Sequence, residues 1–233
     1  MANWFLGRAL AEEAEAENAP WSFLGEGAAF WVTVAVLLVV GVAVYLVTRK
    51  KSSKKSFWTA KTMAVGAMCM ALSSVLSLIK LWSMSMGGSV PPASMLPLLL
   101  FAYCYGVGPG MVLGALYGVM QFLLDGMAWA ALGAIPNLLD YPIAFGLLGL
   151  AGCFRGSKAK MTAGFVLGCF GRFMASFLSG FIFYGQYAPE GVNPVWYSLT
   201  YNGSYMLPET ILTTVAAVLI YKAAPQLFAA QEQ

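Results

Sequence analysis

The stretch LLDYPIAFGLLGLAG, from Leu138 to Gly152, is apolar enough to lie in lipid, yet it holds a carboxylate, Asp140, near its start. In a soluble protein such a carboxylate would be a helix cap. In a membrane-spanning helix an ionisable side chain costs about 3 kcal/mol or more at mid-depth, so it is seldom kept without a partner or a task. If the rest of the chain is that of a membrane protein, Asp140 is a candidate binding residue.

The composition supports a membrane protein. Of the 233 residues, 60% are hydrophobic and only 10% are charged, and the mean hydropathy is +0.73. A soluble domain is nearer half apolar and one quarter charged. The chain has no histidine, and its four cysteines stand singly inside apolar runs, so neither a disulfide framework nor a metal site is indicated. We expect no cofactor and no enzymatic activity.

Hydropathy also predicts the domain organisation. The run AFWVTVAVLLVVGVAVYLVT, residues 29–48, carries no charge and is long enough to span about 30 Å of hydrocarbon. It would be an extra transmembrane helix between an acidic tail, residues 1–28, and a basic linker, residues 49–56. A six-helix domain, residues 57–222, and a short tail, residues 223–233, complete the chain. The six expected spans are 57–82, 94–106, 109–125, 136–154, 161–184 and 203–222. The predicted fold is therefore an all-α integral membrane protein.

Charge asymmetry predicts the orientation of these spans. Residues 49–61 hold six Lys or Arg and no acid, whereas residues 1–28 hold one Arg and five Glu. Basic loops face the cytoplasm, so the N-terminus is expected outside a prokaryotic cell membrane. With this orientation the remaining basic positions near span ends also face the cytoplasm: Arg155, Lys158, Lys160 and Lys222.

Aromatic and polar residues gather on the expected outer side. Trp and Tyr commonly form a belt at the headgroup level, which would account for any single ring. A carboxylate and an amide, Asp140 and Asn202, are expected at the same depth as several rings, and this combination suits a pocket for a flat organic cation. The rings are those of Trp129, Tyr184, Tyr197, Tyr201 and Tyr205.

Five segments in order resemble a known family. They are ALSSVLS, GGSVPPASMLPLLLFAYCYGVGPGMVLGALYG, LLDYPIAFGLLGLAG, GRFMASFLSGFIFYG and YSLTYNGSYMLPE. Over about residues 60–222 the chain resembles the thiamine-specific S component of energy-coupling factor (ECF) vitamin transporters. The resemblance implies capture of thiamine from outside the cell, with release driven by a transmembrane coupling subunit and two ATPase subunits. The chain holds no G-x-x-x-x-G-K-[ST] loop, in agreement with a subunit that borrows ATP hydrolysis from partners.

The resemblance also implies roles for single residues. Asp140, followed by Tyr141, would face the cationic thiazolium ring. Tyr197 and Asn202 match the family's Tyr and Asn ligands, and Asn202 would bind the aminopyrimidine. The remaining matches are Tyr184, at a position where relatives often have an aromatic residue, and Ser176, where the family commonly has a histidine.

Two pairs of residues have more than one interpretation. Ala67 and Ala71 form a small-xxx-small face, which suits either packing within the bundle or, as the resemblance implies, docking to the coupling subunit. Arg172 and Glu209 lie inside apolar spans, and an ion pair between them is favoured over a ligand role.

Alternatives to a thiamine transporter remain. Ser176 leaves open an S component for another cationic or aminopyrimidine compound. A seven-helix receptor is possible by span count, although no lysine lies midway along the last span for a retinal Schiff base. A membrane-embedded enzyme has less support, since paired carboxylates or Ser/His groupings are not apparent.

Overall fold

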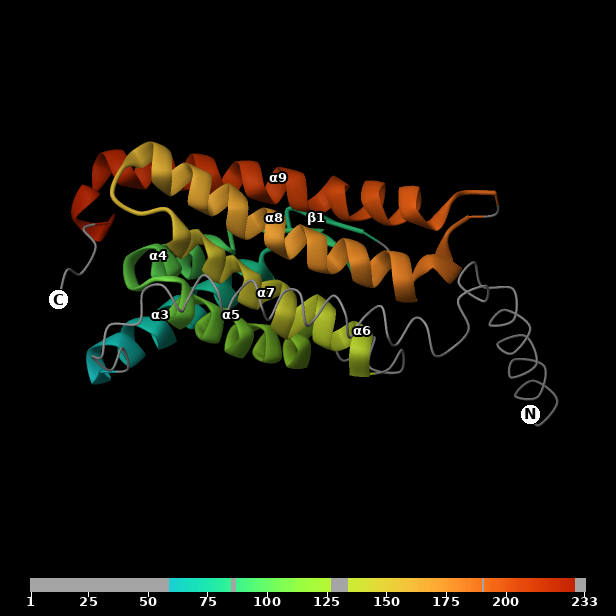
Figure 1. Cartoon of the computed structure of the whole chain (residues 1–233), viewed down its shortest axis with the longest axis horizontal. Helices are drawn as coiled ribbons and strands as arrows, with labels where there is room; N and C mark the ends of the chain where they lie inside the picture. The colour runs from blue at the N-terminus through green and yellow to red at the C-terminus, as the bar shows by residue number, and fades with distance from the viewer. Residues whose placement is uncertain (1–58, 85–86, 127–133, 190, 229–233) are drawn as a thin grey trace.

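The computed structural model describes residues 59–84, 87–126, 134–189 and 191–228. The expected helix at residues 29–48, the N-terminal tail, the basic linker, Trp129 and residues 229–233 of the C-terminal tail lie outside these residues. Within the described residues, five helices are long and apolar enough to cross a membrane, and a sixth is shorter. Figure 1 shows them running roughly along one axis. The chain is therefore a mostly helical, multi-pass membrane protein.

The helical elements follow the expected spans with shifted ends. The order is α3 (Ala60–Leu78), α4 (Leu96–Tyr105), α5 (Val107–Gln121) with the π-helical turn η2 (Phe122–Gly126), α6 (Ala134–Leu138), η4 (Leu139–Ile143), α7 (Ala144–Leu147), η5 (Leu148–Cys153), α8 (Lys158–Phe183), η6 (Gly185–Tyr187), α9 (Pro194–Ala223) and η7 (Pro225–Phe228).

The last long helix, α9, begins earlier than expected, at Pro194 rather than at residue 203. Pro194 occupies the first turn, where a missing N–H costs nothing. The side chain of Asn193 caps the helix by accepting a hydrogen bond of 2.8 Å from Val195 N. Tyr197 and Asn202 therefore project from a regular helix instead of a loop, and their spacing is that of helical turns.

A short hairpin corrects the expectation of a purely helical protein. Strands β1 (Trp82–Ser83) and β2 (Ser89–Val90) pair antiparallel, with Trp82 opposite Val90. Gly87, in the connection between them, has a φ of 87°, a conformation that glycine adopts without steric cost. β2 packs against α9, and Figure 1 shows the hairpin near α9. Hydropathy alone could not separate this hairpin from a loop.

Asp140 lies inside a membrane span rather than at its start. The span Ile135–Cys153 consists of α6, η4, α7 and η5 in succession. Pro142 lies within the π-helical turn η4, where its missing N–H interrupts the regular hydrogen-bond ladder. Such single π-helical turns are frequent at functional sites. Here the turn contains both Asp140 and Tyr141.

Close backbone contact between α5 and the Asp140 span holds this turn in position. A methyl group added at Gly114 would overlap the carbonyl group of Phe145, and one added at Gly118 would overlap that of Tyr141. Small residues allow helix backbones to approach in this way in membranes. The distance between α5 and η4 therefore depends on glycine at these positions.

Candidate functional site

A cavity of about 150 Å³ lies between the hairpin and the helical elements α3, α5, η2, η4, α7, α8 and α9. Its polar side chains come from two sides, which we name by their elements. The η4–α8–α9 wall comprises Asp140, Tyr141, Ser176, Tyr184, Tyr197, Tyr201, Asn202 and Tyr205. The α3–α5 wall comprises Ser77, Tyr117, Gln121 and Asp125.

The cavity brings together eight of the nine residues expected in a binding pocket, and the ninth, Trp129, lies outside the described residues. The residues that line it are Asp140, Tyr141, Ser176, Tyr184, Tyr197, Tyr201, Asn202 and Tyr205. Ala67 and Ala71 do not line it, because they lie exposed on the outer face of α3. The buried face of α3 carries Thr62, Gly66, Ser73 and Ser77 instead. The role of the two alanines, in packing or in docking, stays a prediction.

Asp140 is held by hydroxyl groups rather than by a cation. Ser179 Oγ donates a hydrogen bond of 2.8 Å to Asp140 Oδ2. The hydroxyl groups of Ser176 and Tyr184 are directed toward the same carboxylate. No salt bridge joins Asp140 to a Lys or Arg among the described residues. Hydroxyl donors therefore hold this carboxyl group, and no cation among the described residues is paired with it.

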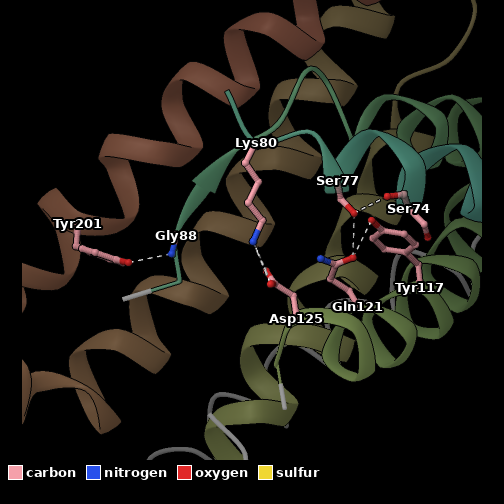
Figure 2. Close-up of polar contacts among 8 residues, drawn as sticks. All are labelled: Ser74, Ser77, Lys80, Gly88, Tyr117, Gln121, Asp125 and Tyr201. Atoms are coloured by element: carbon pink, nitrogen blue, oxygen red, sulfur yellow. Dashed lines mark hydrogen bonds and ion pairs between the residues drawn. The ribbon is translucent and has the colours of Figure 1, made fainter. Parts of the chain in front are cut away.

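The two other carboxylates that line the cavity are paired. Asp125 accepts from Lys80 Nζ at 3.0 Å (Figure 2). Glu209, only 1% exposed, lies 3.3 Å from Arg172 Nη1. The ion pair expected between Arg172 and Glu209 is thus confirmed. Among the described residues, Asp140 is the carboxyl group of the cavity lining that has no cationic partner.

The Arg172–Glu209 pair is part of a wider network that joins three segments. Ser94 Oγ donates to Glu209 Oε1 at 2.6 Å, which ties α9 to the segment before α4. The guanidinium carbon of Arg172 lies 4.2 Å from the centroid of the Phe145 ring, a cation–π contact with α7. This network satisfies the charges that α8 and α9 bring to the cavity.

Asn202 has limited hydrogen-bonding capacity to spare. Its Nδ2 donates to Ser198 O at 2.9 Å and to Ser198 Oγ at 3.2 Å. Its Oδ1 accepts from the Tyr205 hydroxyl at 2.8 Å. A carbonyl oxygen has two lone pairs, so Oδ1 can accept one further hydrogen bond. Asn202 is therefore best suited to bind a donor group such as an amine.

Tyrosine rings supply flat surfaces around these polar groups. The rings of Tyr197 and Tyr201 stack with centroids 6.0 Å apart, and Tyr201 meets Tyr205 edge to face at 5.9 Å. Tyr184 lies just past the end of α8, and burial raises the pKa of its hydroxyl above the usual range. The hydroxyl stays protonated at physiological pH and can donate to Asp140.

The α3–α5 wall was missed in the sequence. Tyr117, Gln121 and Asp125 are spaced four residues apart, which places them along one face of α5 and its extension η2. Such a polar line in an otherwise apolar span was the available signal. The described residues contain no group of three or more His, Cys, Asp or Glu side chains that could hold a metal ion.

Comparisons with known proteins agree with this architecture. The thiamine transporter protein family Thia_YuaJ matches residues 63–229. The thiamine transporter ThiT of Bacillus subtilis is 36% identical over 159 residues, which are 62% of this chain and 81% of that protein. ThiT of Lacticaseibacillus paracasei is 35% identical over 152 residues, 59% of this chain and 76% of that protein. The structure of ThiT from Listeria monocytogenes superposes with a TM-score of 0.63 at 22% identity, covering 72% of this chain and 96% of that one.

Proposed function

Because the chain belongs to the thiamine transporter protein family, we propose that it is the substrate-binding membrane subunit that captures thiamine from outside the cell. Family membership favours this function over a seven-helix receptor. The observation that carries the proposal is the charge balance of the cavity, where Asp140 alone lacks a cationic partner among the described residues. A ligand with one permanent positive charge completes that balance.

The thiazolium ring of thiamine supplies such a charge next to Asp140. A cation in a partly dehydrated site gains far more from a carboxylate than one in water. The surrounding tyrosine rings add cation–π contacts of about 0.5 to 2 kcal/mol each. An anionic ligand would instead meet an uncompensated carboxylate, so the same lining selects against it.

The aminopyrimidine ring is assigned to the part of the η4–α8–α9 wall that α9 contributes. Its exocyclic amine can donate to the free lone pair of Asn202 Oδ1. Tyr197 and Tyr201 present rings on which a flat heterocycle can stack. Ser176, which is 6% exposed and lines the cavity, supplies a small hydroxyl where the family commonly has a histidine.

Transport requires partners, and the outer face of α3 is suited to dock one. Ala67 and Ala71 are exposed there and flanked by apolar side chains, including Met68 at 71% and Leu72 at 53% exposure. Small residues in this spacing allow another helix to approach closely. We assign this face to the transmembrane coupling subunit of an ECF transporter, whose two ATPase subunits would drive release.

A direct binding experiment tests the proposal. The purified protein in detergent is titrated with thiamine by calorimetry, with biotin as a vitamin that lacks the cation. We expect a dissociation constant in the nanomolar to micromolar range for thiamine and no heat for biotin. Folded protein that binds no thiamine, with its fold verified by a cooperative thermal transition, would contradict the proposed substrate.

A second candidate substrate is favoured by Ser176. The shorter side chain leaves room in the cavity for a bulkier cationic or aminopyrimidine compound. Ser176→His distinguishes the two cases. If thiamine is the substrate, the longer side chain adds a hydrogen bond and tightens binding by about 1 kcal/mol. If a bulkier compound is the substrate, Ser176→His weakens the binding of that compound by about 1 to 3 kcal/mol through overpacking. In this case the wild-type protein binds thiamine poorly.

A further inference from the structure

The α3–α5 wall presents a fixed amide group to the cavity. The Tyr117 hydroxyl donates to Gln121 Oε1 at 3.2 Å, and Ser77 Oγ lies 3.4 Å from the same oxygen. The Ser77 proton is engaged with the carbonyl oxygen of Ser74 at 2.8 Å. The Tyr117 hydroxyl thus holds the oxygen end of the amide, and Ser77 lies next to it on α3.

The nitrogen end of the same amide is free. Among the described residues, Gln121 Nε2 has no hydrogen-bond partner. Figure 2 shows this nitrogen directed away from Ser77 and Tyr117, toward the side that holds Lys80 and Asp125. Gln121 lines the cavity, so its two N–H donors are available to a ligand.

Asp125, one helical turn after Gln121, supplies a hydrogen-bond acceptor. Lys80 Nζ contacts its two carboxylate oxygens at 3.0 and 3.3 Å. A carboxylate has about four acceptor sites, so one more donor can be accommodated. A donor from Gln121 together with an acceptor from Asp125 is complementary to an alcohol, which both accepts and donates. A phosphate ester offers no such proton at neutral pH.

The order of elements around the cavity relates this wall to the other two polar positions. Asn202 lies on α9, which packs on α8, and α8 holds Asp140 of η4 through Ser179. η4 in turn packs on α5 at Gly118, one turn before Gln121. On the proposed binding pose, with the amine at Asn202 and the cation at Asp140, α5 with Gln121 is the next polar element around the cavity.

We propose that Gln121 and Asp125 form a third polar subsite, which binds the hydroxyl group of the hydroxyethyl substituent on the thiazolium ring. Gln121 Nε2 donates to the hydroxyl oxygen, and the hydroxyl proton is donated to Asp125. Ser77 and Tyr117 act as positioning residues for the amide. The inference rests on the proposed function, because it takes thiamine as the substrate.

The test compares the affinities of two ligands for the wild-type protein and for a variant of Gln121. Dissociation constants are measured by calorimetry for thiamine and for its analogue with ethyl in place of hydroxyethyl. Wild type is expected to prefer thiamine by at least about fivefold, the effect of one net hydrogen bond. Gln121→Met keeps the length of the side chain but removes the amide, and we expect the preference to fall below twofold while the ethyl analogue binds as before.

Controls separate this inference from the proposed function. Gln226→Leu changes an exposed glutamine of η7 outside the cavity and should leave the preference at its wild-type value. Gln121→Asn keeps the amide but shortens its reach, so it should lose the preference as Gln121→Met does and serves if the latter fails to fold. A folded variant of Gln121 that retains the wild-type preference overturns the subsite. Wild type that binds neither ligand overturns the proposed function instead.

Discussion

At the scale of single residues, the charge of Asp140 determines which ligands the cavity can accept. Asp140→Asn keeps the shape of the side chain and removes the charge. Loss of one member of a buried charge pair costs about 3 to 5 kcal/mol, so thiamine affinity should fall at least about a hundredfold. Calorimetric titration with thiamine measures the effect.

The uncharged aminopyrimidine fragment of thiamine is the control ligand for this substitution. Its binding should be nearly equal in wild type and Asp140→Asn, because it has no cation to neutralise. If Asp140→Asn lowers the affinity for both ligands equally, Asp140 has a structural role as a partner of Ser179, and the charge-balance argument fails.

At the scale of elements, the close packing of α5 on η4 positions the carboxylate. Gly118→Ala would place a methyl group against the Tyr141 carbonyl and push the π-helical turn away from α5. Overpacking of this kind costs about 1 to 3 kcal/mol. We expect a lower melting temperature and weaker thiamine binding, measured by thermal unfolding and calorimetry.

A second glycine on the same helix provides a matched control. Gly108→Ala, also on α5, meets no atom within 4 Å and has an ordinary helical backbone. It should leave the affinity unchanged, and any change in melting temperature reports the strain of a Cβ before Pro109 rather than contact with η4. Equal effects of the two substitutions would mean that helix propensity, not contact with η4, dominates at Gly118.

The outer face of α3 leads to a prediction about coupling. Ala67→Leu combined with Ala71→Leu adds bulk to an exposed face without touching the cavity lining. Uptake of labelled thiamine by cells should be abolished, because a partner helix can no longer approach, while calorimetry on the isolated protein gives the wild-type affinity. Parallel loss of binding and uptake would argue against a docking surface.

At the scale of the whole molecule, the binding function is predicted to belong to the part that matches the family. Every residue that lines the cavity lies between Ser77 and Glu209, inside the matched range 63–229. A chain shortened to begin at Phe57 should bind thiamine with the affinity of the full chain, and thiamine should raise the melting temperature of both equally. A lower thiamine affinity of the shortened chain would assign residues 1–56 a role in binding.

Much of the site was predictable because it lies on segments with local signals. Hydropathy is a property of consecutive residues, so it predicted the spans over 107–126, 135–153 and 158–183 to within a few residues. An isolated carboxylate in an apolar run singled out Asp140, and the resemblance of short motifs supplied Tyr197 and Asn202. These signals do not depend on which helices are neighbours.

The tertiary structure alone decided the features that join distant segments. The α3–α5 wall needs Ser77 and Gln121, 44 residues apart, to meet across two helices. The Arg172–Glu209 pair was expected, but its link to Ser94 spans 115 residues. The uncompensated charge of Asp140 follows only once the partners of Asp125 and Glu209 are known. Composition and periodicity describe what a segment can bury, whereas pairing of polar groups depends on the three-dimensional packing that brings them within hydrogen-bond distance.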